Sequence, residues 1–281
     1  MEAPQRIPSW LKMKIPGGGD YAKVKGVLAR QNLRTVCVDA KCPNIGECFC
    51  SGHATFLIMG GVCTRNCGYC AVHTGAPEPL DSNEPQRIAQ AIKELSLRYA
   101  VITSVTRDDL SDGGAAHFAA CVNLIRHESP GCRIELLIPD FKNSDEHSLS
   151  YVMAAKPDVL NHNIEVTKNL FPILRSQGDY RYSLKVIKRI SDSGITSKSG
   201  LMIGFGEAFD DIRSTLGDLR AAGCASLTVG QYLRSTADGF PVAKFYTPEE
   251  FLEIERISKE LGFSKVLCGP LVRSSYRAID N

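Results

Sequence analysis

The feature that most constrains the fold of this 281-residue chain is a long alternation of short apolar runs with amphipathic stretches. The apolar runs are rich in β-branched residues, as buried strands are, and a stretch with the spacing of a helix follows each of them. The predicted strands are residues 54–60, 99–105, 133–139, 159–164, 197–205 and 226–232. The predicted helices are residues 85–98, 114–127, 144–155, 182–192, 208–222 and 248–261.

Six strand–helix units in series predict an α/β protein with a parallel sheet, because neighbouring parallel strands need a crossover of about a dozen residues between them. Such a series either opens into a doubly wound sheet or curls into a barrel. The order of the units has no obvious reversal point, so we expect a partial (β/α)6 TIM-like barrel. In both folds, ligands bind at the C-terminal ends of the strands.

The two ends of the chain lie outside this alternation. Residues 1–35 are rich in Pro, Gly and Lys and have no sustained apolar period, so we expect an irregular arm there. The cysteine-rich segment 37–70 also lacks helical periodicity, and we expect loops around the first strand. We therefore divide the chain into an N-terminal extension (1–52), a partial barrel (53–262) and a short C-terminal extension (263–281).

Charge and hydropathy disfavour several classes of protein. The formal net charge is +2, which provides no strong attraction to nucleic acid or to a membrane surface. The longest apolar stretches fall far short of the ~20 residues of a membrane span. Basic residues and prolines interrupt the N-terminal segment, so it has no apolar signal core. We expect a cytoplasmic protein that binds neither nucleic acid nor membrane.

The cysteines are unevenly distributed. Seven of the eleven lie between Cys37 and Cys70. In a reducing compartment, clustered cysteines indicate metal binding or catalysis rather than disulfides. We expect the cysteines outside the two motifs described next to be thiols of the core; they are Cys50, Cys121, Cys132, Cys224 and Cys268.

The first motif, Cys63-x3-Cys67-x2-Cys70, follows the first predicted strand. Three thiolates on one tight loop can hold three corners of a cubane cluster and leave its fourth iron without a protein ligand. An open coordination position is what a catalytic metal site needs. Zinc is the alternative, although zinc motifs usually come as paired two-cysteine knuckles.

The second motif is Cys37-x4-Cys42-x5-Cys48, in which Pro43 and Gly46 allow the loop to wrap around a metal centre. A zinc loop, or three unrelated buried cysteines, is the alternative interpretation. Two sets of three cysteines, each lacking one ligand, indicate two iron–sulfur clusters.

The first motif, with Tyr69 before its last cysteine, resembles the signature of the radical S-adenosylmethionine superfamily. This resemblance implies that the open iron chelates the amino and carboxylate groups of S-adenosylmethionine, which is cleaved to a 5′-deoxyadenosyl radical. From residue 10 to residue 276 the chain is similar to the lipoyl synthases. The segments that carry this similarity, beside both cysteine motifs, are 103–110 (TSVTRDDL), 112–114 (DGG), 160–163 (LNHN), 228–234 (TVGQYLR) and 269–276 (GPLVRSSY).

The resemblance implies two [4Fe–4S] clusters. Cys63, Cys67 and Cys70 would hold the cluster that binds S-adenosylmethionine, and Cys37, Cys42 and Cys48 would hold an auxiliary cluster. Ser275, which we favour over Ser274, would be the fourth ligand of the auxiliary cluster. A serine oxygen is a harder ligand than a thiolate and suits iron less well, so it could leave as the cluster is consumed. Ser275 and Arg273 are the expected catalytic residues. An exposed C-terminal tail is the alternative for this segment.

The resemblance also points to residues that would contact S-adenosylmethionine. Gly204 lies in a glycine-rich segment at the end of the fifth strand, where backbone can approach a ligand closely. The other candidates are Tyr69, Ser104, Asn163 and Glu165. A tight turn is the alternative for Gly204, and a satisfied buried polar group is the alternative for each of the others. We interpret His162 as a structural histidine.

The implied reaction inserts sulfur at C6 and C8 of an octanoyl chain carried on a lysine of a lipoyl domain or of the glycine-cleavage H protein. The implied partners are an electron donor such as flavodoxin or ferredoxin, and an iron–sulfur cluster carrier. We hypothesise that basic residues within positions 1–36 help to dock acidic carriers. The alternatives are another radical enzyme with an auxiliary cluster, an iron–sulfur electron carrier or sensor, and a zinc-stabilised binding protein. One departure from the family pattern is Ser235, where proline often follows the arginine.

Overall fold

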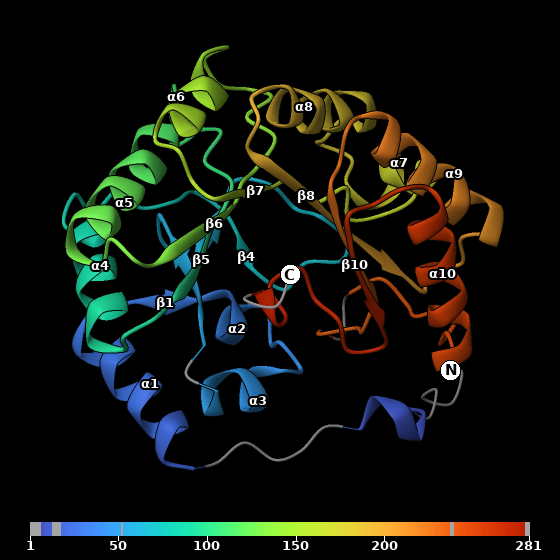
Figure 1. The fold of residues 1–281 in the computed structure, drawn as a ribbon, viewed down its shortest axis with the longest axis horizontal. Coiled ribbons are helices and arrows are strands. Elements are labelled where there is room, and N and C mark those ends of the chain that lie inside the picture. The colour runs from blue at the N-terminus through green and yellow to red at the C-terminus, as the bar shows by residue number, and fades with distance from the viewer. Residues whose placement is uncertain (1–6, 13–17, 52, 237–238, 279–281) are drawn as a thin grey trace.

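A curved sheet forms the inner wall of the protein, and helices cover its outer face (Figure 1). The computed structural model describes residues 7–12, 18–51, 53–236 and 239–278. Within these residues the strands follow the order β1 (Arg34–Thr35), β2 (Thr55–Ile58), β5 (Tyr99–Ser104), β6 (Arg133–Leu137), β7 (Val159–Asn161), β8 (Thr196–Ile203), β9 (Ser226–Gln231) and β10 (Lys265–Gly269). Strand β1 is antiparallel to β2, and all the other neighbours are parallel.

The principal helices return the chain from one parallel strand to the next, and Figure 1 shows them as an arc around the sheet. They are α4 (Glu84–Glu94), α5 (Ala115–Glu128), α6 (Ser148–Ala154), α8 (Tyr180–Asp192), α9 (Phe209–Ala221) and α10 (Pro248–Glu260). Helix α10 begins at a capping box. Thr247 Oγ1 accepts a hydrogen bond from Glu250 N, and the Glu250 carboxylate accepts one from Thr247 N. The predicted partial barrel of six strand–helix units is confirmed.

Side chains of each strand alternate between the outer core and the interior of the barrel. On β5, Ala100 and Ile102 pack among the helices in the outer core. Tyr99 and Val101 face the other way and pack against Ala278, near the C-terminus. The segment that ends at Ala278 therefore reaches the interior of the barrel, beside segments from the N-terminal part of the sequence (Figure 1).

A buried ion pair crosses the interior of the barrel. Lys198 Nζ lies 3.0 Å from Glu135 Oε1, and the two side chains are 1% and 0% exposed. Tyr99 donates from its hydroxyl to Glu135 Oε2 at 2.7 Å, and Asn161 donates from Nδ2 to Glu135 Oε1 at 3.1 Å. One carboxylate thus links strands β5, β6, β7 and β8.

The N-terminal part is more regular than the sequence predicted. The expected irregular arm is wrong for residues 19–30, which form helix α1 (Gly19–Arg30). This helix buries only Val24, Val27 and Leu28, and so short a stripe within a polar segment gives little periodicity. Of the basic residues of the proposed docking arm, Arg6 and Lys14 lie outside the described residues.

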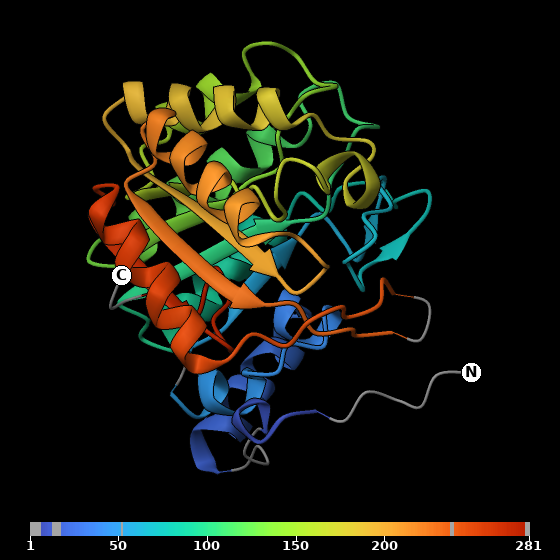
Figure 2. The ribbon, with the colours of Figure 1, turned by 90° about the vertical axis from the view of Figure 1, so that its right-hand side faces the viewer.

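Short helices also occur in the cysteine-rich segment, where we predicted loops. Helices α2 (Val36–Asp39) and α3 (Ile45–Cys50) carry Cys37 and Cys48, and a short 3₁₀ helix (Ser9–Leu11) precedes α1. Tyr21 of α1 packs on Phe49 of α3, with ring centroids 5.5 Å apart. This packing fixes the two helices against each other, and Figure 2 shows the blue N-terminal helices together below the sheet.

Both edge strands of the sheet, β1 and β10, come from segments that we assigned to the extensions. The division of the chain into three regions stays a prediction. Of the cysteines expected in the core, Cys121, Cys132 and Cys224 are buried, whereas Cys50 and Cys268 are partly exposed. Among the helices of the described residues, none is both long and apolar enough to cross a membrane.

The buried pair gives a test of the fold. Replacement Lys198→Met leaves the Glu135 carboxylate buried without its cation, and we expect the free energy of unfolding to fall by about 3–5 kcal/mol. The matched control is Lys188→Met, which breaks an exposed pair with Asp192. That change is expected to cost less than ~1 kcal/mol. Urea unfolding monitored by circular dichroism measures both, and equal losses in the two variants would contradict the interpretation.

Candidate active site

The Cys63–Cys70 loop leaves the end of β2 and is closed on itself by two short strands, β3 (Val62–Cys63) and β4 (His73–Thr74). Backbone N–H groups point at its sulfurs: those of Arg65 and Thr106 lie 3.4 Å and 3.3 Å from Cys63 Sγ. Val72 N lies 3.4 Å from Cys70 Sγ. Hydrogen bonds to sulfur are one of the ways a protein sets the potential of an iron–sulfur cluster.

The three thiols of this loop lie close enough to influence one another. Burial, and then the neighbouring Cys67 and Cys63, raise the pKa of Cys70 to about 12. Burial also raises the pKa of Cys67, while the Arg175 guanidinium opposes that shift. Iron binds thiolates, so loading of this loop would release protons, and the charge of the iron would offset the cost of burying the thiolates.

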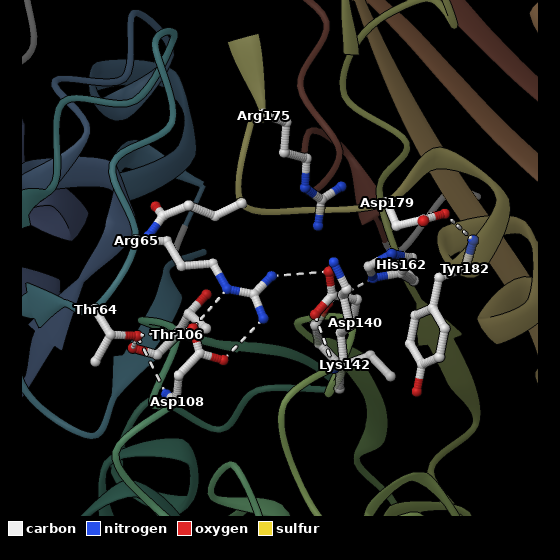
Figure 3. Close-up of polar contacts among 12 residues, drawn as sticks. Thr64, Arg65, Thr106, Asp108, Asp140, Lys142, His162, Arg175, Asp179 and Tyr182 are labelled. Atoms are coloured by element: carbon white, nitrogen blue, oxygen red, sulfur yellow. Dashed lines mark hydrogen bonds and ion pairs between the residues drawn. The ribbon is translucent and has the colours of Figure 1, made fainter. Parts of the chain in front are cut away.

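Arg65 ties the loop to the barrel, and Figure 3 shows its guanidinium between two carboxylates. Its Nε and Nη2 donate to Asp108 at 2.7 Å and 2.8 Å, and its Nη1 donates to Asp140 at 2.8 Å. The Arg65 side chain is 3% exposed and that of Asp140 is 0% exposed. Although burial acts to raise it, the hydrogen bond and charge of Arg65 hold the pKa of Asp140 at about 2.

The start of the loop depends on an unusual backbone turn at Met59, whose φ is 66°. Met59 N donates to Glu84 Oε2 at 2.8 Å, and Arg107 Nη1 donates to Met59 O at 3.3 Å. A side chain at Gly114 would place its Cβ 2.1 Å from Met59 Sδ. Gly114 is therefore needed for the Met59 side chain to pack in this position. Asp112 accepts from the first N–H groups of α5 and fixes this segment.

Helix α7 (Phe171–Leu174) and the residues after it form the opposite wall of the loop. Gly68 N donates to Leu174 O at 2.8 Å, and Asn66 N donates to Gln177 Oε1 at 2.7 Å. Arg175 Nη1 donates to Asn163 O at 2.8 Å. Figure 3 shows the Arg175 guanidinium directed into the space between Arg65 and His162.

The residues proposed to contact S-adenosylmethionine lie at the C-terminal ends of the strands and on the loop. Ser104 ends β5, and Asn163 and Glu165 follow β7. Ser104 Oγ and Asn163 Oδ1 are buried without a hydrogen-bond partner among the described residues. Buried polar atoms of this kind call for a polar ligand. These residues therefore fit a bound S-adenosylmethionine.

Two further details concern the same space. Burial raises the pKa of Glu165, and the charge of Arg175 and a hydrogen bond from Asn163 Nδ2 at 3.1 Å oppose the shift. Gly204 follows β8 with φ 120°, and a Cβ there would lie 2.8 Å from Lys244 O. Glycine is therefore required at residue 204 by the close packing of the chain, as in the tight turn that was the alternative for this position. His162 Nδ1 lies 3.0 Å from Ile138 O, as expected of a structural histidine.

A second site lies in the mouth of the barrel, where a cavity of about 180 Å³ is lined by Cys37, Cys42 and Cys48. Ser275 and Arg273 also line it, and Ser274 does not. Burial, followed by the charges of Cys37 and Cys42, raises the pKa of Cys48 to about 12. Three thiols and one hydroxyl thus converge on one cavity, which is the donor set expected for the auxiliary cluster.

Neither set of cysteines is arranged for a single ion. Within the described ranges, no three His, Cys, Asp or Glu side chains are grouped so that one metal ion could bind them. A cubane cluster does not require such convergence, because each thiolate binds a different iron.

Sequence reasoning did not assign roles to Arg65, Glu84 or Asp108. Arg65 lies between two motif cysteines, and Asp108 follows a predicted strand, so position is the signal that could have found them. Asp140, the partner of Arg65 that follows β6, is 75 residues away in sequence. No local pattern connects such residues, and their pairing became evident only from the fold.

Comparison with known proteins gives independent information on the family. A model of the radical SAM superfamily matches residues 57–219, and a model of the N-terminal domain of lipoyl synthase matches residues 2–42. Lipoyl synthase of Rubrobacter xylanophilus is 50% identical over 273 residues, which cover 96% of this chain and 85% of that protein. Lipoyl synthase of Methylococcus capsulatus is 48% identical over 278 residues, covering 98% and 86%.

Solved structures with low sequence identity share the fold. Methylornithine synthase matches with a TM-score of 0.59 at 14% identity, covering 75% of this chain and 70% of that one. The [FeFe]-hydrogenase maturase HydG from Carboxydothermus hydrogenoformans matches with a TM-score of 0.58 at 14% identity, covering 80% and 64%.

The Met59 turn provides a test of how the loop is positioned. We expect Gly114→Ala to lower the free energy of unfolding by about 1–3 kcal/mol, because the new Cβ displaces Met59 from its packing. Iron bound per chain after anaerobic reconstitution should fall as well. The control is Gly217→Ala in α9, where a Cβ meets nothing within 4 Å. That variant should keep its iron and gain up to ~1 kcal/mol. Normal iron content and stability in Gly114→Ala would refute this account.

Proposed function

This chain belongs to the lipoyl synthase family, and from that membership we propose which of its residues carry out the insertion of sulfur. The reaction places two sulfur atoms at C6 and C8 of a protein-bound octanoyl-lysine. S-adenosylmethionine supplies the radicals, and an auxiliary [4Fe–4S] cluster supplies the sulfur. Membership sets aside the electron-carrier and zinc-protein alternatives.

We assign the radical-generating cluster to Cys63, Cys67 and Cys70. The support is their common loop at the C-terminal end of β2, with N–H groups directed at two of the three sulfurs. Arg65 holds this loop to the ends of β5 and β6 through Asp108 and Asp140. These residues bind and orient the cluster, and they do not move protons.

Ser104, Asn163, Glu165, Tyr69 and Gly204 would bind S-adenosylmethionine. The Ser104 hydroxyl can donate or accept a hydrogen bond to the ligand, and Asn163 Oδ1 can accept one. Glu165 supplies a carboxyl group that would pair with the ligand's amino group; burial raises its pKa, and the charge of Arg175 and the hydrogen bond from Asn163 oppose that rise. Gly204 would contact the ligand through its backbone at the end of β8.

Cys37, Cys42, Cys48 and Ser275 would hold the auxiliary cluster. The observation that carries this proposal is that one cavity is lined by all four, although the cysteines and the serine come from opposite ends of the sequence. Arg273 acts on the same cavity, since its charge lowers the pKa of Cys42 against the effect of burial. Its guanidinium would offset the negative charge of the bound cluster.

The protein substrate is an octanoylated lipoyl domain, and the glycine-cleavage H protein is a proposed second carrier. We also propose a small electron-transfer protein, flavodoxin or ferredoxin, as the reductant, and an iron–sulfur cluster carrier that rebuilds the auxiliary cluster. Free, clustered cysteines are maintained in a reducing compartment, which supports a cytoplasmic location.

The serine assignment is tested by a matched pair. In Ser275→Ala we expect the reconstituted enzyme to release 5′-deoxyadenosine while the sulfur-inserted product falls by more than about tenfold. Ser274→Ala, which changes a residue outside the cavity lining, should retain insertion. Mass spectrometry of an octanoyl-lysine peptide after a single turnover distinguishes the two. Full insertion by Ser275→Ala would exclude it as a required ligand.

Binding of S-adenosylmethionine is tested at Asn163. Asn163→Ala removes a hydrogen-bonding group facing the ligand, so the KM for S-adenosylmethionine should rise by about tenfold, the equivalent of ~1.4 kcal/mol. Asn169→Ala changes an exposed asparagine nearby in sequence and should leave KM unchanged. The rate of 5′-deoxyadenosine formation against ligand concentration measures both, and an unchanged KM in Asn163→Ala would remove that residue from the binding site.

A further inference from the structure

We propose that Glu47 is a positioning residue that ties the Ser275-bearing tail to the cysteine loop of the auxiliary site. The tail is residues 270–278, and the proposal rests on the function assigned above to Ser275. Glu47 is not a cluster ligand in this proposal. It fixes the position of the tail relative to helix α3, which carries Cys48.

The first part of the tail is held firmly by the barrel. Gln231 N donates to Pro270 O at 3.3 Å, and Val272 is 6% exposed. A Cβ at Gly230 would lie 2.0 Å from Val272 O, so the tail packs directly against the backbone of β9, where residue 230 has no side chain. Asn44 Nδ2, from the cysteine loop, donates to Leu271 O at 2.6 Å. These contacts fix where the tail enters the mouth of the barrel.

The far end of the tail is held by apolar packing. Ala278 is 5% exposed and packs with Tyr99 and Val101 on the inner face of β5. Between these two anchors the chain makes a turn, in which Tyr276 N donates to Arg273 O at 2.9 Å. Ser275 lies in this turn, so its distance from the cysteines depends on how the turn is oriented.

Glu47 contacts this turn directly. Tyr276 donates from its hydroxyl to Glu47 Oε1 at 2.8 Å, and Arg277 Nη2 reaches the same oxygen at 3.3 Å. Both donors immediately follow Ser275, and Glu47 immediately precedes Cys48. The Glu47 carboxylate thus binds Tyr276, the neighbour of the proposed serine ligand. Glu47 is itself the neighbour of Cys48, so this contact connects the two parts of the site.

The backbone of the turn needs such support. Arg277 has a φ of 47°, in the left-handed region that is unfavourable for a residue with a Cβ. The contact with Glu47 holds the chain in this conformation. The contact can also open, because the Glu47 and Arg277 side chains are 52% and 61% exposed and exposed ion pairs are weak.

The tail is fixed where it enters the barrel and again at Ala278, and exposed side chains hold the turn between these two points. The turn that carries Ser275 is therefore the part of the auxiliary site that can move. Cys37 and Cys48 lie on α2 and α3, which pack against the sheet and α1, and Cys42 lies between these helices, whereas the turn is oriented by side chains at the surface. Glu47 therefore positions Ser275 while leaving it able to withdraw, which suits a cluster that is consumed and rebuilt.

The test measures the tail itself in the cluster-loaded enzyme. In Glu47→Ala and Tyr276→Phe we expect hydrogen exchange in residues 270–278 to become about tenfold faster, with exchange in α10 unchanged. Glu47→Gln, which keeps an acceptor oxygen, should lie between these variants and the wild type. The control Glu94→Ala removes another exposed ion pair, with Arg30, and should leave the tail unchanged. Wild-type exchange of the tail in both Glu47→Ala and Tyr276→Phe would overturn the proposal.

A second measurement separates this proposal from the assignment of Ser275. The rate at which a chelator removes auxiliary iron should rise about tenfold in Glu47→Ala, and this increase should vanish in the Ser275→Ala background. If Ser275→Ala inserts sulfur normally, the ligand assignment fails, and tail exchange still decides whether Glu47 positions the turn. If Glu47→Ala speeds iron loss equally with and without Ser275, the carboxylate does not act through the serine and the proposal is wrong.

Discussion

The ion pairs of Arg65 with Asp108 and Asp140 are the interaction on which the radical site depends. Taking these charges out of water costs several kcal/mol for each ion, and only close, paired geometry offsets that cost. The fork of the guanidinium satisfies both carboxylates at 2.7–2.8 Å, so Arg65 has little freedom. Because Arg65 lies between Cys63 and Cys67, the cluster loop is fixed relative to the ends of β5 and β6, where the ligand-binding residues begin.

The two cluster sites are built differently, and the difference follows their roles. The loop of Cys63 is fixed by buried charges and by backbone contacts with α7, which suits a cluster that must survive many turnovers. The auxiliary site is assembled from the two ends of the sequence around a cavity, with an exposed carboxylate joining them. On the assignment proposed above, a rigid scaffold would hold the radical-generating cluster, and a more open one would hold the cluster that is consumed.

The sequence predicted the features that lie within a short window and missed the contacts between residues far apart in the chain. Strand–helix alternation identified all six units, because each signal lies within a short window. The spacing of the cysteines predicts two ligand triads for the same reason, and the structure places one triad on a single loop and the other around one cavity. Helix α1 was missed because its buried stripe has three residues. Ser275 and Ser274 are adjacent, so only the position of the tail in the barrel separates them. The partners of Arg65, and the contact between Glu47 and Tyr276, join residues far apart in sequence.

The inner face of β8 connects the two sites. Side chains two residues apart on a strand point to the same face, so Lys198 and Gly200 both face the interior. Lys198 pairs with Glu135, which accepts from Tyr99 in the wall of the auxiliary cavity. A Cβ at Gly200 would lie 2.7 Å from Asn163 Oδ1, which is buried without a hydrogen-bond partner among the described residues and which we propose faces S-adenosylmethionine. Two residues of one strand, Lys198 and Gly200, therefore contact the surroundings of both proposed sites, so a displacement of β8 at one site would be transmitted to the other.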